Sequence, residues 1–197
     1  MTDFWNERYA TEEYAYGTEP NLFLKEKLEQ LTPGKILFPA EGEGRNAVFA
    51  AKMGWTVTAF DVSTEGKRKA EMLASKNKVQ IDYRIDNYEN VSFQPEYFDC
   101  IVLIFAHTHP MKRNEYHRKL MSFLKPGGTL ILEGFSKKQI VNNSGGPRDI
   151  NMLFSKEELQ SDFGSFSKLM IAEKDYAINE GPFHQGIASV IRAFGEK

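Results

Sequence analysis

The sequence is poor in cysteine: its 197 residues include one, Cys100. A single thiol forms neither an intramolecular disulfide nor a cysteine metal cluster, so we expect neither to hold the fold. Long apolar runs are also missing. The longest, from Cys100 to Ala106, is far shorter than the roughly 20 residues that cross a bilayer. The first residues carry acids and lack an apolar segment, so we expect no signal peptide and a cytoplasmic location without membrane partners.

An excess of charge of one sign is missing as well. The 25 Lys and Arg residues and 27 Asp and Glu residues give a net charge of −2. No long basic stretch interrupts this balance, so nucleic acid is not an expected partner. Hydrophobic residues make up 41% of the chain, enough for one core. We therefore expect a single domain over residues 1–197, and the sequence does not indicate its oligomeric state.

Against this background, the stretch from Ile36 to Ala51 organises the chain. It opens with a short apolar run, passes through Gly42 and Gly44, and continues into an alanine-rich segment suited to a helix. Glycines at a strand-to-helix turn permit positive φ and let a ligand approach the backbone. The first N–H groups of the following helix favour an oxygen-rich ligand. This pattern is typical of a nucleotide-binding start.

The next strand strengthens this interpretation. Residues 55–60 are mostly β-formers and end on Asp61, seventeen positions after Gly44. In a βαβ unit, this position brings a carboxylate to the ribose hydroxyls of an adenosine cofactor. A glycine turn, a helix, a strand and a terminal acid together predict a cofactor site.

Further along, apolar patterns and turn residues predict five strand–helix steps followed by a hairpin. Predicted helices cover 21–31, with Asn21 as N-cap, then 63–77 and 111–124, and a short one opens at the Ser155–Glu158 capping box. Predicted strands after Asp61 cover 79–85, 98–105, 129–135, 166–178 and 186–194. The fold class is therefore α/β.

Two segments are predicted to lie outside the regular strand–helix steps. Residues 1–32 are expected to form a helical and aromatic cap, in which the first 20 residues are either a helix with a buried aromatic face or a flap over a ligand. Residues 136–154 lose periodicity and contain Asn-Asn-Ser-Gly-Gly-Pro. A loop of this length in a compact domain is often functional, so we predict a substrate loop there.

With these motifs in order, the chain resembles class I S-adenosylmethionine-dependent methyltransferases over nearly its whole length. The resemblance is carried by the turn at 40–46, the acids at Asp61 and Asp86, Phe-Asp-Cys-Ile-Val from Phe98, and Leu-Lys-Pro-Gly-Gly-Thr-Leu from Leu124. Within that family it looks most like small bacterial tellurite-resistance and thiopurine methyltransferases, through short stretches that begin at residues 16, 132, 145 and 184. The family implies a Rossmann-like three-layer α/β/α sandwich, with a seven-stranded, mostly parallel sheet and a C-terminal antiparallel hairpin.

The resemblance also implies S-adenosylmethionine as cofactor and a small-molecule substrate, a thiol or chalcogen species among the candidates. Phe38 stands where many relatives have an acid, so the methionyl amine is expected to meet Glu41 or backbone carbonyls. Cofactor contacts carry over to the following residues: Ala40, Glu41, Gly42 and Gly44 at the turn, Asp61 and Val62 at the ribose, Asp86 and Asn87 at adenine, and Phe105, Ala106 and Tyr16 toward the substrate.

Histidines are the candidate catalytic groups. Imidazole exchanges a proton near neutral pH, so His107 or His184 is predicted to act as general base where the acceptor must lose a proton. His107 and His109 have a spacing that metal ligands can use, but no third ligand is identifiable. We therefore expect no metal.

Two other functions stay open at this point. A non-catalytic S-adenosylmethionine-binding module would share the same turn and acids. An NAD-linked oxidoreductase would also share them, but its turn normally continues Gly-x-x-Gly, whereas Gly44 is followed by Arg45, Asn46 and Ala47.

Overall fold

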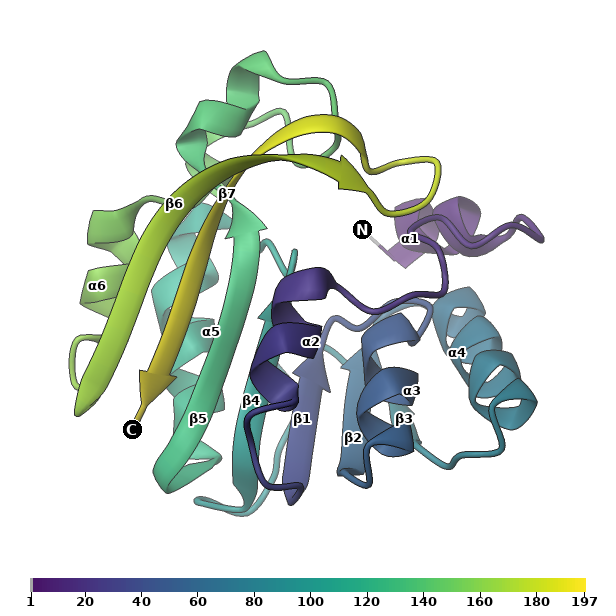
Figure 1. Ribbon diagram of the computed structural model, residues 1–197, viewed down its shortest axis with the longest axis horizontal. Coiled ribbons are helices and arrows are strands. Elements are labelled where there is room, and N and C mark those ends of the chain that lie inside the picture. The colour runs from purple at the N-terminus through teal and green to yellow at the C-terminus, as the bar shows by residue number, and fades with distance from the viewer. Residues whose placement is uncertain (1) are drawn as a thin grey trace.

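The computed structural model describes residues 2–197, so Met1, the first residue of the predicted cap, lies outside it. Within these described residues, seven strands and six helices follow one another, with two short 3-10 turns, and Figure 1 shows their arrangement. In order they are α1 (Thr2–Tyr9), α2 (Leu22–Leu28), β1 (Lys35–Pro39), α3 (Arg45–Lys52), β2 (Thr56–Asp61), α4 (Thr64–Lys76), β3 (Asp82–Ile85), β4 (Phe98–Ile104), α5 (Pro110–Ser122), β5 (Leu124–Phe135), η1 (Lys137–Val141), η2 (Ile150–Met152), α6 (Lys156–Phe163), β6 (Lys168–Asn179) and β7 (Gln185–Glu196).

The strands form one sheet in the order β3-β2-β1-β4-β5-β7-β6. The five strands from β3 to β5 pair in parallel, and β7 is antiparallel to both β5 and β6. The order reverses between β1 and β4, which is the point where open α/β sheets bind ligands beyond the strand ends. The predicted fold, including the closing hairpin, is confirmed.

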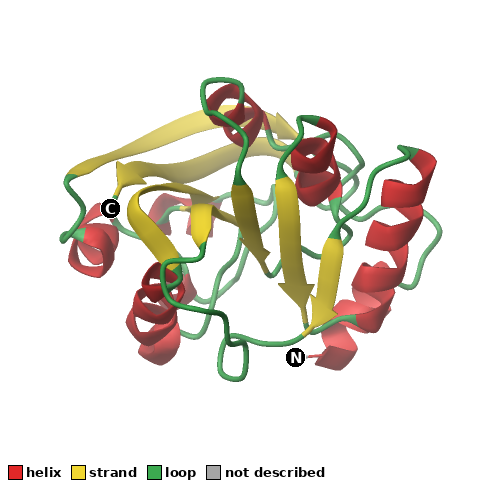
Figure 2. Ribbon diagram, turned by 90° about the horizontal axis from the view of Figure 1, so that it is seen from below, coloured by secondary structure: helices red, strands yellow, loops and turns green. Residues whose placement is uncertain are grey.

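Helices cover both faces of the sheet, which gives the predicted three layers (Figure 2). On one face, α2, α3 and α4 bury their apolar sides against β1 and β2, in a core that includes Leu24, Phe38 and Ala50. On the other face, α5 and α6 pack through Leu120, Leu159 and Phe163. The central strands β1 and β4 are therefore apolar on both sides, as their nearly continuous hydrophobic sequences predicted.

Several helix starts form as their sequences predicted. Asn21 and Ser63 accept hydrogen bonds from the backbone N–H groups of Leu24 and Gly66. Ser155 and Glu158 form the reciprocal capping box that opens α6. These caps fix where the helices begin, and hence where the preceding loops leave the sheet.

Two strand starts differ from the prediction by three residues or more. The third strand begins at Asp82 and not Val79, because Lys78 turns into the left-handed region and the Val79 N–H bonds back to the Ala74 carbonyl of α4. The fifth strand begins at Leu124 and not Thr129. The Pro-Gly-Gly segment, which follows the end of α5 closely, forms an irregularity within β5, where the register against β4 shifts.

The N-terminal segment is joined to the glycine turn by a buried ion pair. Lys69 of α4 lies 2.6 Å from Glu43, and both side chains are 3% exposed. The same ammonium donates to the carbonyls of Thr11 and Glu13, at 2.9 and 2.7 Å. Burial raises the pKa of Glu43 against the effect of Lys69, so the pair holds two charges away from water. One lysine therefore ties residues 11–13 to the turn after β1.

Replacing this lysine alone should leave a buried, uncompensated carboxylate. We expect Lys69→Met to lower the free energy of unfolding by about 3–5 kcal/mol, and the double variant Glu43→Gln/Lys69→Met to recover most of that loss. Urea unfolding measures both values. Lys67→Met on the same helix, which removes only an exposed pair with Glu71, is the matched control and should change stability by less than about 1 kcal/mol. If Lys69→Met were as stable as Lys67→Met, the buried ion pair between Lys69 and Glu43 would not have the role assigned to it.

Candidate active site

The carboxyl ends of β1 and β4 carry unusual backbone geometry. Ala40, directly after β1, has φ 51°, and Phe105, directly after β4, has φ 51°. Both are non-glycine residues in the left-handed region, which costs energy and is concentrated at functional sites. These two strands flank the reversal in strand order. The strain therefore lies where the fold is expected to bind a ligand.

Asp61, at the end of β2, joins the two turns around this point. One carboxylate oxygen accepts the Gly42 N–H at 3.0 Å, and the other accepts the Ser63 N–H at 2.9 Å. The residue is 6% exposed. Burial raises the pKa of Asp61, while the N–H donors of Ser63 and Gly42 favour its ionised form. The predicted ribose-binding acid thus also shapes the glycine turn.

The two glycines of the turn have the positive φ that the sequence predicted, 64° at Gly42 and 84° at Gly44. Their close neighbours are protein groups. A Cβ on Gly44 would lie 2.5 Å from the Cβ of Ala70, so this glycine permits α3 and α4 to pack together. A Cβ on Gly42 would lie 2.6 Å from the hydroxyl of Tyr9, on the covering helix α1. Packing of the turn against α1 and α4 therefore requires these glycines in addition to any approach of a ligand.

Glu41 occupies the amino end of α3. One of its carboxylate oxygens accepts the N–H groups of Asn46 and Ala47, at 2.9 and 2.8 Å. The expectation that these N–H groups face a ligand directly is therefore wrong, because a side chain caps them first. Burial raises the pKa of Glu41 to about 7, against these donors and the nearby Arg45. A cationic ligand group beside Glu41 would stabilise its charge.

The predicted adenosine contacts lie at neighbouring strand ends. Val62 follows Asp61 and is half-buried, and Asp86, directly after β3, donates its backbone N–H to the Asp61 carbonyl. Asn87 spends its side-chain oxygen on the N–H groups of Glu89 and Asn90. The side-chain amide nitrogen of Asn87 is therefore the group that could donate a hydrogen bond to an adenine edge.

Four rings meet above the ends of β4 and β5. The His184 ring lies 4.4 Å from Tyr16, 4.6 Å from Phe105 and 5.2 Å from Phe135, measured between centroids. The structure thus brings together three predicted site residues from distant parts of the chain, Tyr16, Phe105 and His184, with Phe135, which the sequence did not single out. Ala106, the other residue expected here, is buried in the core between the sheet and α5.

This group of rings lies under two covering segments. Gly17 and Gly181 approach each other where the N-terminal segment meets the tip of the β6–β7 hairpin, and Phe183 donates its N–H to the Ala15 carbonyl. In Figure 1 the hairpin arches over the strand ends toward α1. Gly145, in the predicted substrate loop, packs against the His184 ring. The first of the two predicted alternatives is formed in part, since α1 is a helix whose buried Tyr9 packs on the glycine turn, while the flap over a ligand stays a prediction.

The two candidate histidines have different surroundings. In His107, Nδ1 donates to the Met152 carbonyl at 2.9 Å, and Nε2 accepts the Phe135 N–H at 3.0 Å. Its ring stacks on Phe154. Burial lowers the pKa of His107 to about 4, so the ring is neutral and both nitrogens are engaged. His107 holds the 150–154 segment, and its assignment as a general base is corrected on these contacts.

A group of charges beside the turn was missed by the sequence analysis. Arg45, the first residue of α3, pairs with Glu180 of the hairpin tip at 2.6 Å. Asn21 donates to Glu180 and also to Glu133, an acid with no exposed surface in the middle of an apolar strand. The one available signal was Glu133 itself, because an acid inside a buried strand requires partners from elsewhere in the fold.

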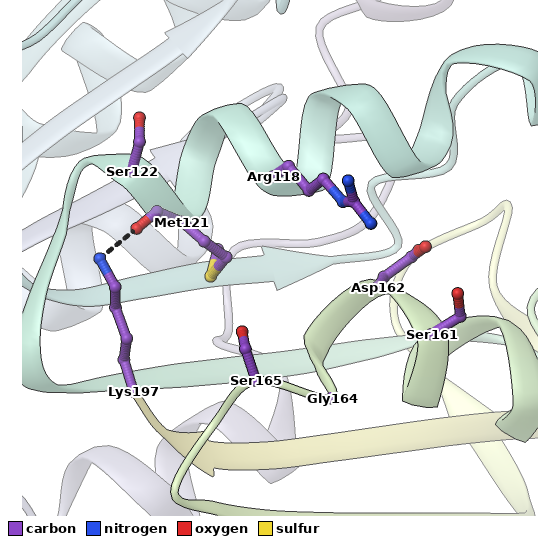
Figure 3. Close-up of a pocket in the computed structure, with 8 residues that line it drawn as sticks. All are labelled: Arg118, Met121, Ser122, Ser161, Asp162, Gly164, Ser165 and Lys197. Carbon is purple, nitrogen blue, oxygen red and sulfur yellow. Dashed lines mark hydrogen bonds between the residues drawn. The ribbon is translucent and has the colours of Figure 1, made fainter.

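A cavity of about 510 Å³ lies elsewhere, between α5, α6 and Lys197, at the amino ends of the parallel strands (Figure 3). Arg118 and Asp162 line it, and Lys197 donates to the Met121 carbonyl there. The candidate active site lies at the opposite, carboxyl ends of these strands, so the cavity is not part of it. Within residues 2–197, no cluster of three or more metal-binding side chains occurs, and no helix has the length and hydropathy to cross a membrane.

The neutral, buried His107 predicts a pH effect on stability. Its pKa is about 4 in the folded chain and about 6.5 when unfolded, so the unfolded chain binds more protons between these values. Stability from this group is complete above pH 6.5 and falls as the pH approaches 4, by about 3 kcal/mol at most. Urea unfolding of His107→Gln should show a shallower loss than the parent over this range. An equally steep loss of stability with falling pH in the variant and in the parent would contradict the assignment of this effect to His107.

Comparison with known proteins adds independent information. Residues 36–128 match the family described as a methyltransferase domain. Curated relatives include ubiquinone biosynthesis O-methyltransferases of Xanthomonas campestris and Xanthomonas euvesicatoria. The first is 32% identical over 107 residues, which is 53% of this chain and 45% of the relative. The second is 29% identical over 109 residues, 55% of this chain and 46% of the relative. The chain thus spans less than half the length of these relatives.

Solved structures share the fold at low identity. A methyltransferase from Methanosarcina mazei has a TM-score of 0.69 at 19% identity, over 90% of this chain and 98% of that one. TehB from Haemophilus influenzae has a TM-score of 0.74 at 16% identity, over all of this chain and 66% of that one. Residues 36–128 thus match a methyltransferase-domain model, and the whole chain has the fold of these solved structures.

Proposed function

We propose that the chain transfers a methyl group from S-adenosylmethionine to a small-molecule acceptor, with the cofactor bound at the ends of β1 and β2. One observation carries this proposal: Asp61, the glycine turn and the strained Ala40 and Phe105 converge at the reversal in strand order, inside the matched methyltransferase domain. The sulfonium of the bound cofactor would supply the reactive methyl group, so the protein's task is binding, alignment and exclusion of water.

The residues at this site fit the cofactor. Asp61 offers a carboxylate for two ribose hydroxyls, while Val62, Asp86 and the Asn87 amide border the adenine position. Ala40, Gly42 and Gly44 would pass beside the methionyl part. Glu41 suits the amine, because burial raises the pKa of its carboxyl and none of the ion pairs within residues 2–197 involves it. The hydrogen bonds that Asp61 already makes support this placement, since they hold its carboxylate in place before any ligand arrives.

On the acceptor side, His184 is our candidate for the general base. Its ring is buried among Tyr16, Phe105 and Phe135, next to the predicted substrate loop. His107 is set aside because both of its ring nitrogens are engaged. An aromatic enclosure excludes water and suits a small, polarizable acceptor, so a thiol or chalcogen species is our first choice. The names of the Xanthomonas relatives make an oxygen acceptor the second.

Isothermal titration of the purified protein tests the proposal. Micromolar binding of both S-adenosylmethionine and S-adenosylhomocysteine is expected, followed by methyl transfer in a screen of thiols, oxidised chalcogens and phenols. Cofactor binding without turnover on any acceptor would favour a non-catalytic binding module. Binding of NAD in place of both compounds would overturn the cofactor assignment.

Asp61 carries the first quantitative prediction. We expect Asp61→Ala to weaken S-adenosylmethionine binding by about 1.5–3 kcal/mol, or about ten- to a hundredfold, through lost hydrogen bonds to a charged group. Because Gly42 and Ser63 also lose their acceptor, the variant should melt at a lower temperature without ligand. Titration calorimetry gives the affinity. Asp82→Ala, an exposed acid on β3, is the control. An unchanged dissociation constant in Asp61→Ala would remove the assignment.

Glu41 predicts a proton linkage. Without cofactor its pKa is about 7, so it is about half protonated at neutral pH. An ammonium group beside it favours the ionised form, so binding should release protons at pH 7 and tighten as the pH rises through 7. Titrations in two buffers of different ionisation enthalpy measure this release. Glu41→Gln keeps an oxygen for the N–H groups of α3 but should lose most of the buffer dependence. A parent protein whose binding heat ignores the buffer would refute the linkage.

A further inference from the structure

Glu180, at the tip of the β6–β7 hairpin, connects the candidate base with the glycine turn. Its Oε2 lies 3.5 Å from His184 Nδ1 and accepts a hydrogen bond from Arg45 at 2.6 Å. Its Oε1 accepts from the Asn21 side chain at 3.1 Å. The side chains of Glu180, Arg45 and His184 are 10%, 8% and 6% exposed. These contacts join three separate segments through one buried carboxylate.

The turn itself does not require this carboxylate. Backbone hydrogen bonds close it, from the Glu180 N–H to the His184 carbonyl at 2.8 Å and from the His184 N–H to the Gly181 carbonyl at 3.4 Å. A buried carboxylate is costly unless it is paired, and an apolar residue would avoid that cost. The position of Glu180 between an arginine and a histidine therefore suggests a role in the site.

Buried His184 Nδ1 makes no hydrogen bond in the structure, and Glu180 Oε2 lies 3.5 Å from it. A proton on Nδ1 would face this carboxylate and leave the lone pair on Nε2, as a general base requires. A base oriented by a carboxylate on its other nitrogen is a recurrent arrangement in catalysis, and the contact is often loose before the substrate binds. At 3.5 Å the Glu180–His184 contact is longer than an ordinary N–H···O hydrogen bond, so a small movement would form one.

The surroundings of His184 contain charges of both signs. Arg45 of α3 and Arg8 of α1 oppose a positive imidazole, and Glu180 favours it. The Tyr16 and His107 side chains complete the titratable groups around it. Burial lowers the pKa of His184, and Glu180 acts against that effect. Among these groups, Glu180 is the one whose negative charge favours the protonated form of His184.

We propose that Glu180 is a positioning residue, which orients His184 as general base and couples its position to the cofactor turn through Arg45. This inference rests on the proposed function, since it concerns the same reaction. Arg45 follows Gly44 directly, so a movement of the turn when the cofactor binds would reach His184 through two side chains. Glu180 itself would touch neither the cofactor nor the acceptor.

The first test needs no acceptor. The ring protons of His184, followed by NMR across pH, report its pKa in the parent and in Glu180→Gln, which removes the charge but keeps an oxygen near Arg45. We expect the His184 midpoint to move to lower pH in this variant. Glu180→Asp keeps the charge and the Arg45 pair but withdraws the carboxylate from the ring, so it should shift less. It also carries the test if Glu180→Gln folds poorly.

The second test uses the acceptor from the screen above. We expect Glu180→Gln to lower kcat/KM at pH 7 by about tenfold or more and to move the acid limb of the pH profile to lower pH. The affinity for S-adenosylmethionine should change less than about twofold. Glu196→Gln, at the opposite end of the hairpin, removes an exposed pair with Lys168 and serves as the matched control. It should match the parent in every measurement.

The outcomes separate this inference from the proposed function. If the protein binds no S-adenosylmethionine, the proposed function fails, while the His184 titration still reports whether Glu180 faces the ring. If cofactor binds and turns over, but both Glu180 variants leave the His184 midpoint and the pH profile unchanged, the positioning role is overturned. A shifted midpoint together with a shifted acid limb establishes it.

Discussion

The fold depends on a buried carboxylate at the end of β2. Asp61 accepts one backbone N–H from the turn after β1 and another from the turn after its own strand, so it fixes both loops that border the proposed cofactor position. Backbone donors hold the carboxylate in place although burial raises its pKa. The position is thus prepared before a ligand binds, which reduces the cost of ordering it. Its neighbours are arranged around that point: Glu41 caps α3, and Gly44 lets α3 pack against α4.

Two segments from opposite ends of the chain cover Asp61 and the glycine turn. Lys69 and Glu43 attach the N-terminal residues to the turn, and Arg8 lies over the Phe183 ring of the hairpin tip, 3.9 Å from its centroid. Cofactor and acceptor would enter beneath this cover, so we expect its contacts to loosen and reform during a catalytic cycle. The buried Arg45–Glu180 pair links the cover to α3, which gives the two halves of the site a shared charged centre.

Local patterns predicted the fold well, because strand periodicity, caps and turn residues act over a few positions. They also located Asp61 and the glycine turn, since a βαβ unit fixes their spacing. The pattern could not reveal that Glu41 caps α3 or that a Cβ on Gly44 would meet Ala70, because both depend on how distant elements pack. The same limit applies to His107 and His184. Only the tertiary contacts distinguish a histidine with both nitrogens engaged from one that faces a carboxylate.

A crystal structure of the protein with S-adenosylhomocysteine tests the central claim most directly. The account predicts the ribose hydroxyls within hydrogen-bond distance of Asp61, the methionyl amine beside Glu41, and the sulfur directed toward Phe105 and His184. A ligand bound instead in the cavity lined by Arg118 and Lys197, or with its ribose away from Asp61, would contradict the account.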